Sequence, residues 1–387
     1  MNILLQIILV LFFAKVFGEF FVRIGFPSVL GEIFAGIFLG TMIFVNPDNE
    51  ILKFLAELGV IFLLFTTGYK EVNLRELQGI FRQSISPTIF GVMIPFIFGF
   101  LLGTVFNFTL LESLFIGAAF CPTSIGASVR VLIDLKYIST KVGSTILSAA
   151  ILDDVIAIFT LAVLTQIALY SKIAFGQILT MGGKLVTFIF IMVVLGLHVL
   201  PKLFKYIQKM HVEEAIFSGV IVVALFSAFL ADELGLHAVI GAFLGGLILS
   251  TLPFAKIRDV KDKVSGFSYG IFVPIFFVFI GLSVDLDALI AAGLFTALLI
   301  ILALVGKILG GFIGSKLVGF DSYDSLIFGV GMMPRAEVGV VIISIGKSMG
   351  VISSEIFSAV VLMVAISLIV TPIALKYTVG LTNRSIS

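Results

Sequence analysis

The stretch STILSAAILDDVIAIFTLAVLTQIAL, from Ser144 to Leu169, places two adjacent carboxylates in a helix that is otherwise apolar enough to cross a membrane. A carboxylate at bilayer depth costs about 2.5–3.5 kcal/mol on insertion scales. Packing does not explain two such groups side by side, and ionisable residues within a span mark ion or substrate pathways. Asp153 and Asp154 are therefore the first candidates for a functional site, and the stretch predicts a helical membrane protein.

The composition of the whole chain agrees with this stretch. Of the 387 residues, 60% are hydrophobic and only 12% are charged, whereas soluble domains carry about 25% charged residues. The net charge of +1 gives no indication of nucleic-acid binding. Cys121 is the single cysteine of the sequence, so it has no partner for an intramolecular disulfide. We predict an all-α polytopic membrane protein with little soluble mass.

Apolar windows in the sequence predict the transmembrane helices. Windows of about 17–25 apolar residues suit helices that cross a hydrocarbon core about 30 Å thick. We expect about thirteen such helices. Their approximate limits are 2–22, 27–45, 53–69, 81–105, 110–134, 139–170, 177–206, 213–231, 235–251, 266–284, 288–317, 323–347 and 354–378.

Basic residues gather in one set of alternate loops, which is the pattern of cytoplasmic loops in membrane proteins. They are Arg23, Lys70, Arg75, Arg82, Arg130, Lys136, Lys141, Lys202, Lys205, Lys209, Lys256, Arg258, Lys261, Lys263, Lys316, Lys376 and Arg384. The opposite loops are acidic, and their bases are Lys53, Lys172 and Lys347. This asymmetry predicts an external N-terminus and a cytoplasmic C-terminus.

The two halves of the sequence repeat each other at an offset of 210–213 residues. The aligned pairs are VLGEIFAGIFLG from Val29 with VIGAFLGGLILS from Val239, FLLFTTG ending at Gly68 with IFFVFIG ending at Gly281, and the segment around Pro122 with that around Pro334. Spans 1–6 therefore match spans 8–13. Because seven crossings separate equivalent helices, the second copy enters the membrane from the other side. Such inverted repeats are typical of secondary transporters with a site near the midplane.

Two repeat-equivalent spans, the fifth and the twelfth, are each interrupted by a proline with polar neighbours. The two groups are Pro122, Thr123 and Ser124 in the fifth span, and Pro334, Arg335 and Glu337 in the twelfth. Proline removes a helix N–H and clashes with the preceding turn. Non-helical backbone at membrane depth is tolerated inside protein or beside a cavity. The matched pair predicts broken helices at a substrate site.

Broken helices leave backbone groups that carry partial charges of about half a unit. Glu337 would compensate the positive helix ends and Arg335 the negative ones. The alternative is that Arg335 and Glu337 pair with each other or with neighbours and stabilise the twelfth span.

Lys307 is a further charge well inside an apolar span. A buried ammonium either loses its proton or finds a carboxylate, and Asp153 and Asp154 are the candidates. Consecutive helical residues differ by about 100° in direction, so both carboxylates do not face one partner. We expect one of them to pair with Lys307 and the other to face a water-filled cavity.

A carboxylate in such a cavity suits a small hard cation, which takes oxygen ligands. The hydroxyls of Thr123 and Ser124 are available to supply further ligands. A buried carboxylate also holds a proton more readily than an exposed one. A group that accepts either a cation or a proton, but never both, acts as an exchanger.

The motifs resemble those of the cation:proton antiporter-2 family, and the NapA type of sodium/proton antiporter in particular. The matching segments are Asp153-Asp154, PTSIGASVRVL from Pro122, GKILGG from Gly306, MPRAEVG from Met333 and VLGEIFAG from Val29. The resemblance implies the NhaA-like fold. It also implies that Asp154 binds Na⁺ and the proton, that Asp153 pairs with Lys307, and that Thr123 and Ser124 lie at the unwound crossing.

By the same resemblance, spans 4–6 and 11–13 form a core that moves like an elevator against a dimerising panel of spans 1–3 and 8–10. The implied division is 1–75 and 213–287 for the panel, 76–170 and 288–387 for the core, and 171–212 for a linker helix. Electrogenic relatives with the paired aspartates and a membrane lysine exchange two protons for one sodium. One net charge per cycle is worth about 2.3 kcal/mol per 100 mV.

We therefore expect a homodimeric sodium/proton antiporter of a prokaryotic cell membrane that serves pH homeostasis, with no enzyme activity and no cofactor. Its substrates would be a monovalent cation and the proton. Its other partner would be membrane lipid, and it would not bind nucleic acid. The residues do not separate Na⁺ from Li⁺ or K⁺. Glu32 either lines the panel–core boundary or bonds to backbone, and His211 either senses pH or is a solvated loop residue.

Three other functions are considered. Potassium/proton exchange or ligand-gated potassium efflux occurs in relatives that often carry a nucleotide-binding domain, and this sequence shows none. An intramembrane aspartyl protease needs two aspartates from different helices, whereas Asp153 and Asp154 are adjacent. An organic-anion symporter would use Arg335 to bind the carboxylate of its substrate, but the aspartate pair and Lys307 argue against this function.

Overall fold

The computed structural model describes residues 2–42, 45, 47, 49–71, 74–124, 128, 132, 135, 137, 138, 140–169, 175–252, 258–335 and 337–385. Within these ranges it describes all side chains except those of residues 71, 74–82, 169, 175–182, 185, 258, 291, 337 and 381–385. Every regular element in the described ranges is a helix, and these ranges contain no strand. The predicted all-α class is therefore confirmed.

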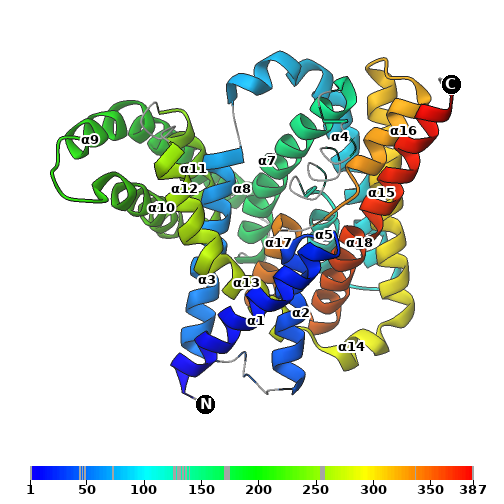
Figure 1. The fold of residues 1–387 in the computed structure, drawn as a ribbon, viewed down its shortest axis with the longest axis horizontal. Coiled ribbons are helices and arrows are strands. Elements are labelled where there is room, and N and C mark those ends of the chain that lie inside the picture. The colour runs from blue at the N-terminus through cyan, green and yellow to red at the C-terminus, as the bar shows by residue number, and fades with distance from the viewer. Residues whose placement is uncertain are drawn as a thin grey trace.

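The helices of the first half are numbered in chain order (Figure 1). They are α1 (Ile3–Arg23), α2 (Ser28–Met42), α3 (Glu50–Thr66), α4 (Leu74–Val105), α5 (Leu110–Ala119), α7 (Lys141–Leu169), α8 (Phe175–Val194) and α9 (Leu200–Ile207). One π-helical turn, Thr67–Glu71, continues α3, and another, Leu195–Val199, joins α8 to α9.

The second half continues with nine helices in the described ranges. They are α10 (Ala215–Glu233), α11 (Ala238–Ser250), α12 (Arg258–Phe267), α13 (Val273–Leu282), α14 (Leu286–Ala291), α15 (Gly293–Leu317), α16 (Ser322–Gly331), α17 (Glu337–Ser348) and α18 (Ser354–Ser385). A π-helical turn at Ser268–Phe272 joins α12 to α13. In Figure 1 the N-terminus and α14 lie at the lower edge of the view, and the C-terminus lies at the upper edge.

Nine helical runs of the described chain are long and apolar enough to cross a membrane. They are Ile3–Arg23, Glu50–Lys70, Gln83–Val105, Lys141–Ala168, Val186–Ile207, Ala215–Glu233, Asp259–Leu282, Gly293–Leu317 and Ser354–Gly380. Four shorter apolar helices accompany them: Ser28–Met42, Leu110–Ala119, Ala238–Ser250 and Val338–Ser348. The chain is thus a multi-pass membrane protein.

Two groups of helices pack chiefly within themselves. In the first group α2 packs on α1 and α13, while α11 packs on α3 and α10. In the second group α4 packs on α5, α7 and α15, while α15 packs on α16 and α18. A buried apolar cluster that includes Leu63, Phe276, Phe295 and Val341 joins the two groups.

Close backbone approach between α4 and α15 depends on glycine. A Cβ on Gly310 of α15 would lie 2.4 Å from the carbonyl oxygen of Phe90 in α4, and one on Gly314 would lie 2.6 Å from Cα of Pro87. Small residues of this kind are what let membrane helices touch along their backbones. The contact holds the α15 face that carries Lys307 beside α4.

Helix α7, which carries Asp153 and Asp154, contacts both broken helices. It packs against α5 on one side of the first break and against α16 and α17 on either side of the second. As expected, the helices are interrupted near the prolines: α5 ends at Ala119, before Pro122, and α16 ends at Gly331, before Pro334. The paired aspartates therefore lie next to the two interruptions.

Candidate functional site

The two interrupted helices meet through their non-helical segments. The backbone N–H of Ser124 donates to the carbonyl oxygen of Pro334 at 2.8 Å. In the opposite direction, Nη1 of Arg335 donates to the carbonyl oxygen of Pro122 at 3.2 Å. Each interruption therefore satisfies backbone groups that the other has lost, as buried irregular backbone requires.

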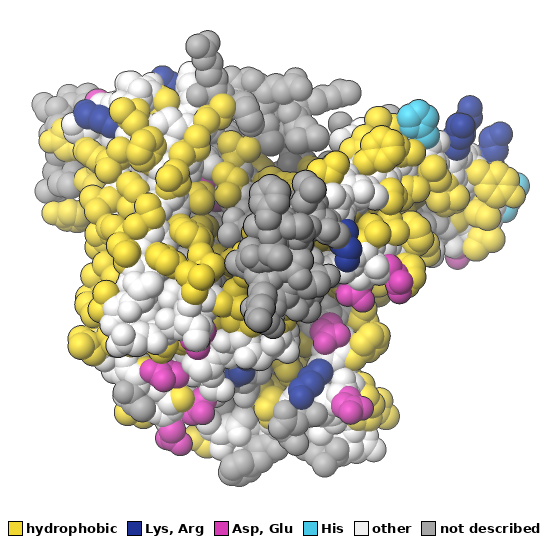
Figure 2. All heavy atoms as spheres, turned by 180° about the vertical axis from the view of Figure 1, so that it is seen from behind, with side chains coloured by type: hydrophobic (Ala, Val, Ile, Leu, Met, Phe, Trp, Pro, Cys, Tyr) yellow, Lys and Arg dark blue, Asp and Glu magenta, His cyan; other side chains and the backbone are white. Residues whose placement is uncertain are grey.

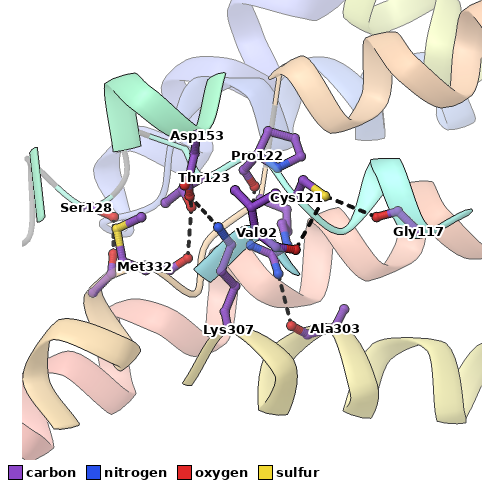
Figure 3. Close-up of polar contacts among 12 residues, drawn as sticks. Val92, Gly117, Cys121, Pro122, Thr123, Ser128, Asp153, Ala303, Lys307 and Met332 are labelled. Atoms are coloured by element: carbon purple, nitrogen blue, oxygen red, sulfur yellow. Dashed lines mark hydrogen bonds and ion pairs between the residues drawn. The ribbon is translucent and has the colours of Figure 1, made fainter. Parts of the chain in front are cut away.

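Asp153 is fixed by two side chains from different helices. Its Oδ2 accepts hydrogen bonds from Nζ of Lys307 on α15 and, at 2.9 Å, from Oγ1 of Thr123 in the first interruption. Asp153 and Lys307 are both fully buried. Figure 3 shows the three side chains converging. Lys307 therefore pairs with Asp153, the partner that the family resemblance implies, whereas residue chemistry had left both aspartates open.

Thr123 connects this ion pair to the second interruption. Its Oγ1 lies 2.9 Å from Oδ2 of Asp153 and 3.2 Å from the carbonyl oxygen of Met332 (Figure 3). A hydroxyl has one proton to donate, so it serves these two acceptors one at a time. Within the described residues, Oδ1 of Asp153 has no hydrogen-bond partner.

Asp154 occupies a different environment from its neighbour. Adjacent helical residues point about 100° apart, so Asp154 does not follow Asp153 toward Lys307. Asp154 keeps 6% of its surface exposed, whereas Asp153 keeps none. The two carboxylates are thus distinguished by the helix geometry: one is held by Lys307, and the other retains a small accessible surface.

Arg335 is fully buried and bonds to backbone carbonyls. Besides Pro122, its guanidinium donates through Nη2 to the carbonyl oxygen of Ala303 on α15 at 3.0 Å. Its backbone N–H donates to Oγ of Ser367 on α18 at 2.9 Å. These contacts favour compensation of backbone carbonyls over pairing with a carboxylate. The side chain of Glu337 lies outside the described residues, so its part remains a prediction.

Sequence reasoning missed Ala303, Ser367 and Met332, which contribute to the site through a backbone oxygen, a hydroxyl and a backbone oxygen, respectively. A backbone acceptor leaves no trace in the residue type. Ser367 stands as a polar residue in the apolar helix α18, and that signal was available. Ser124 and Pro122 lie at the crossing, as predicted, and Ser124 is buried.

A cavity of about 1270 Å³ opens between the two groups of helices. Its walls come from α2, α3, α11 and α13 on one side and from α17 and α18 on the other. We call the end of the molecule with Asp232, Asp285 and Asp287, which line this cavity, the acidic end. Figure 2 shows acidic side chains mostly in the lower half of the face that it displays. Neither Asp153 nor Asp154 is among the described lining residues.

Comparison with known proteins places these features in a family. Residues 8–380 match the model of the transmembrane sodium/hydrogen exchanger family. The chain is 31% identical to the Na⁺/H⁺-K⁺ antiporter GerN of Bacillus cereus, over 98% of this chain and 97% of that protein. It is 32% identical to a Na⁺/H⁺ antiporter of Enterococcus hirae, over 92% of each.

A solved structure has the same fold. The sodium proton antiporter MjNhaP1 of Methanocaldococcus jannaschii at pH 8 superposes with a TM-score of 0.72 at 17% identity, over 97% of this chain and 96% of that one. Together with the match along nearly the whole sequence, the paired aspartates beside two crossed interruptions agree with a transporter rather than an enzyme. The chain belongs to the transmembrane sodium/hydrogen exchanger family.

Proposed function

We propose that this protein is a sodium/proton antiporter in which Na⁺ and H⁺ compete for the carboxylate of Asp154. The supporting observation is the difference between two adjacent acids: Asp153 is held by Lys307 and Thr123, while Asp154 retains accessible surface. Because Asp153 is fully buried between Lys307 and Thr123, and Asp154 is the acid of the pair that keeps accessible surface, we assign the ion site to Asp154. Asp154 would bind Na⁺ when it has lost its proton, and Thr123 and Ser124 would contribute oxygens.

We assign Lys307 and Asp153 to proton coupling. In this proposal Na⁺ binding draws Asp153 away from Lys307, and the ammonium, left in an apolar interior, gives up its proton. Together with the proton from Asp154, that makes two protons per sodium and an electrogenic cycle. The full burial of Asp153 and Lys307 supports this assignment. While the two groups are paired, each compensates the charge of the other, and when they separate, each tends to become neutral.

We assign charge compensation at the crossing to Arg335 and Glu337, with Pro122 and Pro334 making the breaks. The bonds from Arg335 to the carbonyls of Pro122 and Ala303 support its part. We expect Glu337 to face free N–H groups.

We further propose thirteen spans in two inverted repeats and an elevator cycle. The core would be residues 76–170 and 288–387, the panel residues 1–75 and 213–287, and the linker residues 171–212. The two self-packed groups of helices support this division. We also propose that the panel forms a homodimer and that the N-terminus is external. The acidic loops at the end with Asp232 and Asp285 support the external N-terminus.

Potassium is the second candidate ion. The observation that favours it is the likeness to GerN, which is named as a Na⁺/H⁺-K⁺ antiporter. The same carboxylate would serve K⁺ if the remaining oxygens stand further apart, because a larger ion needs longer ligand distances.

The decisive experiment uses the purified protein in liposomes that contain a pH-sensitive dye. Na⁺, Li⁺ or K⁺ is added outside, and the change of internal pH is compared between wild type, Asp154→Asn and Asp259→Asn. Asp259 is an exposed acid paired with Lys263 and serves as the control. We expect Asp154→Asn to lose at least nine-tenths of the exchange and Asp259→Asn to keep it. Full exchange by Asp154→Asn would disprove the assignment.

A further inference from the structure

Lys347 occupies an unusual position at the acidic end of the molecule. It lies in the last turn of α17, in the proposed core, and it lines the large cavity between core and panel. The opposite wall is formed by the end of α13 and the turn that follows it, residues 281–287, in the proposed panel. Lys347 therefore projects toward the boundary that an elevator cycle would have to rearrange.

The ammonium of Lys347 bonds across that boundary. Its Nζ donates to the carbonyl oxygen of Ser283 at 2.9 Å and lies 4.1 Å from the ring centroid of Phe357. Ser283 caps the C-terminus of α13. Carbonyls at a helix C-terminus lack intrahelical donors and carry partial negative charge, so a cation is their preferred partner. The Phe357 ring, on α18 of the core, steadies the same ammonium through a cation–π contact.

Two other hydrogen bonds cross the boundary at the same end. The backbone N–H of Asp285 donates to Oγ of Ser358, a fully buried hydroxyl on α18, at 2.9 Å. Nε2 of Gln166, near the end of α7, donates to the carbonyl oxygen of Gly235 in the turn before α11. The first bond joins α18 to the junction between panel and core, where Asp285 caps the start of α14, and the second joins α7 to a panel turn. The acidic end is thus fastened at three points on three different core helices.

A core that slides relative to α13 cannot keep the bond between Lys347 and Ser283, because Ser283 caps α13. A hydrogen bond of 2.9 Å is lost once its atoms separate beyond about 3.5 Å, so a relative movement of about 1 Å suffices to break it. Bonds within the panel do not face this requirement. Nζ of Lys70, for example, donates to Oγ of Ser265 at 3.1 Å, and both residues belong to the panel.

We infer that Lys347 is a positioning residue for transport: it latches the core to the panel at the acidic end, and the latch opens in each transport cycle. This inference rests on the proposed function, because only a moving core requires the bond to open. Lys347 supplies the one charged donor among these three bonds. Four carboxylates line the same cavity as Lys347: Glu57, Asp232, Asp285 and Asp287.

The first test locks the latch. In a background in which Cys121 is replaced by Ala, two double variants are made. S283C/K347C spans the boundary, and K70C/S265C is the control within the panel. Both proteins are treated in liposomes with a flexible bifunctional thiol reagent that a reductant reverses. We expect cross-linking of S283C/K347C to lower exchange at least tenfold and reductant to restore it, with no change for K70C/S265C.

Two outcomes overturn the latch. One is exchange at the original rate after complete cross-linking of S283C/K347C, verified by mass spectrometry. The other is absence of that cross-link where K70C/S265C reacts fully, because Lys347 would then not face Ser283. In both cases the uncross-linked protein still exchanges cations for protons, so the proposed function stands. Loss of exchange in the uncross-linked wild type is instead the failure of the proposed function.

The second test opens the latch. K347M keeps the length of the side chain without its charge, and K347R keeps the charge. Lys316, whose Nζ donates to Oγ of Ser322 inside the core, gives the control K316M. With Na⁺ supplied from the side of the acidic end, we expect K347M to change the KM for Na⁺ at least threefold and K347R to change it less. K316M should leave this KM unaltered. Equal KM values for all four proteins would contradict the role of Lys347.

Discussion

Lys307 of α15 and Asp153 of α7 form an ion pair in which neither side chain is exposed. The residues are 154 positions apart in the sequence and join two helices of the proposed core. Removing one member of a buried pair leaves the other as an uncompensated charge, which costs about 3–5 kcal/mol. The pair therefore makes the stability of the core depend on the same two groups to which proton coupling is assigned.

Lys307→Ala should destabilise the protein and alter its response to voltage. We expect a loss of about 3–5 kcal/mol in unfolding free energy, since Asp153 would remain charged and buried. We also expect exchange that no longer responds to an imposed membrane potential, because the second proton is lost. Thermal unfolding in detergent and flux in liposomes with a potassium diffusion potential measure these effects. The double variant Lys307→Ala/Asp153→Asn should recover stability, and a double variant as unstable as the single one would argue against the pair.

Thr123→Val should weaken the hold on Asp153. The substitution replaces the hydroxyl by a methyl group and removes a bond to a charged group, worth about 1.5–3 kcal/mol. We expect lower thermal stability and a raised KM for Na⁺, because the proposed ion site also loses an oxygen. Thr123→Ser retains the hydroxyl and is the matched control. If Val and Ser variants behave alike in liposome flux, the hydroxyl has no part in the site.

Arg335→Lys should fail to replace arginine despite keeping the charge. The planar guanidinium reaches two carbonyl oxygens, of Pro122 and Ala303, and a single ammonium cannot reproduce this fork. We expect a loss of about 1.5–3 kcal/mol in unfolding free energy for one lost charge-assisted bond. We also expect reduced exchange, because the crossing loses a fixed geometry. Unchanged melting and flux in Arg335→Lys would show that charge alone is sufficient.

Gly281→Ala should destabilise the panel. A Cβ at Gly281 would lie 2.0 Å from the carbonyl oxygen of Ile33, so α2 and α13 would have to separate. Overpacking of this kind costs about 1–3 kcal/mol. Gly270→Ala is the control, because a Cβ there meets no atom within 4 Å. The measurement is thermal unfolding in detergent, and equal melting temperatures for the two variants would refute the close contact.

Tyr137 predicts an alkaline limit to stability. This loop residue donates from its hydroxyl to Oδ1 of Asp324 at 3.2 Å, and burial, followed by the charge of Asp324, raises the pKa of Tyr137 to about 12. The unfolded chain loses this proton near its ordinary pKa of about 10. Stability due to Tyr137 is therefore complete below pH 10 and falls between pH 10 and 12. Tyr137→Phe should melt with less pH dependence in that window, and an identical profile would exclude Tyr137 as the cause.

Much of the site was predictable because charge in an apolar span is costly whatever the packing. Asp153, Asp154 and Lys307 were identified by that cost, and Pro122 and Pro334 by the helix bonds that proline removes. The family could be predicted because most of its motifs include these residues. Residue chemistry did not decide which aspartate meets Lys307. That depends on the rotation of α7 relative to α15, which many distant contacts set together.

The sequence by itself determined the all-helical membrane class, the two helix breaks and the candidate charges, because each follows from local chemistry in a medium without water. The tertiary structure decided which groups meet. Asp153 pairs with Lys307, which the family resemblance implied but residue chemistry left open; Arg335 reaches the backbone oxygen of Ala303, and Lys347 reaches that of Ser283. Backbone acceptors are the same in every residue type, so only the packing of helices far apart in the chain could select them.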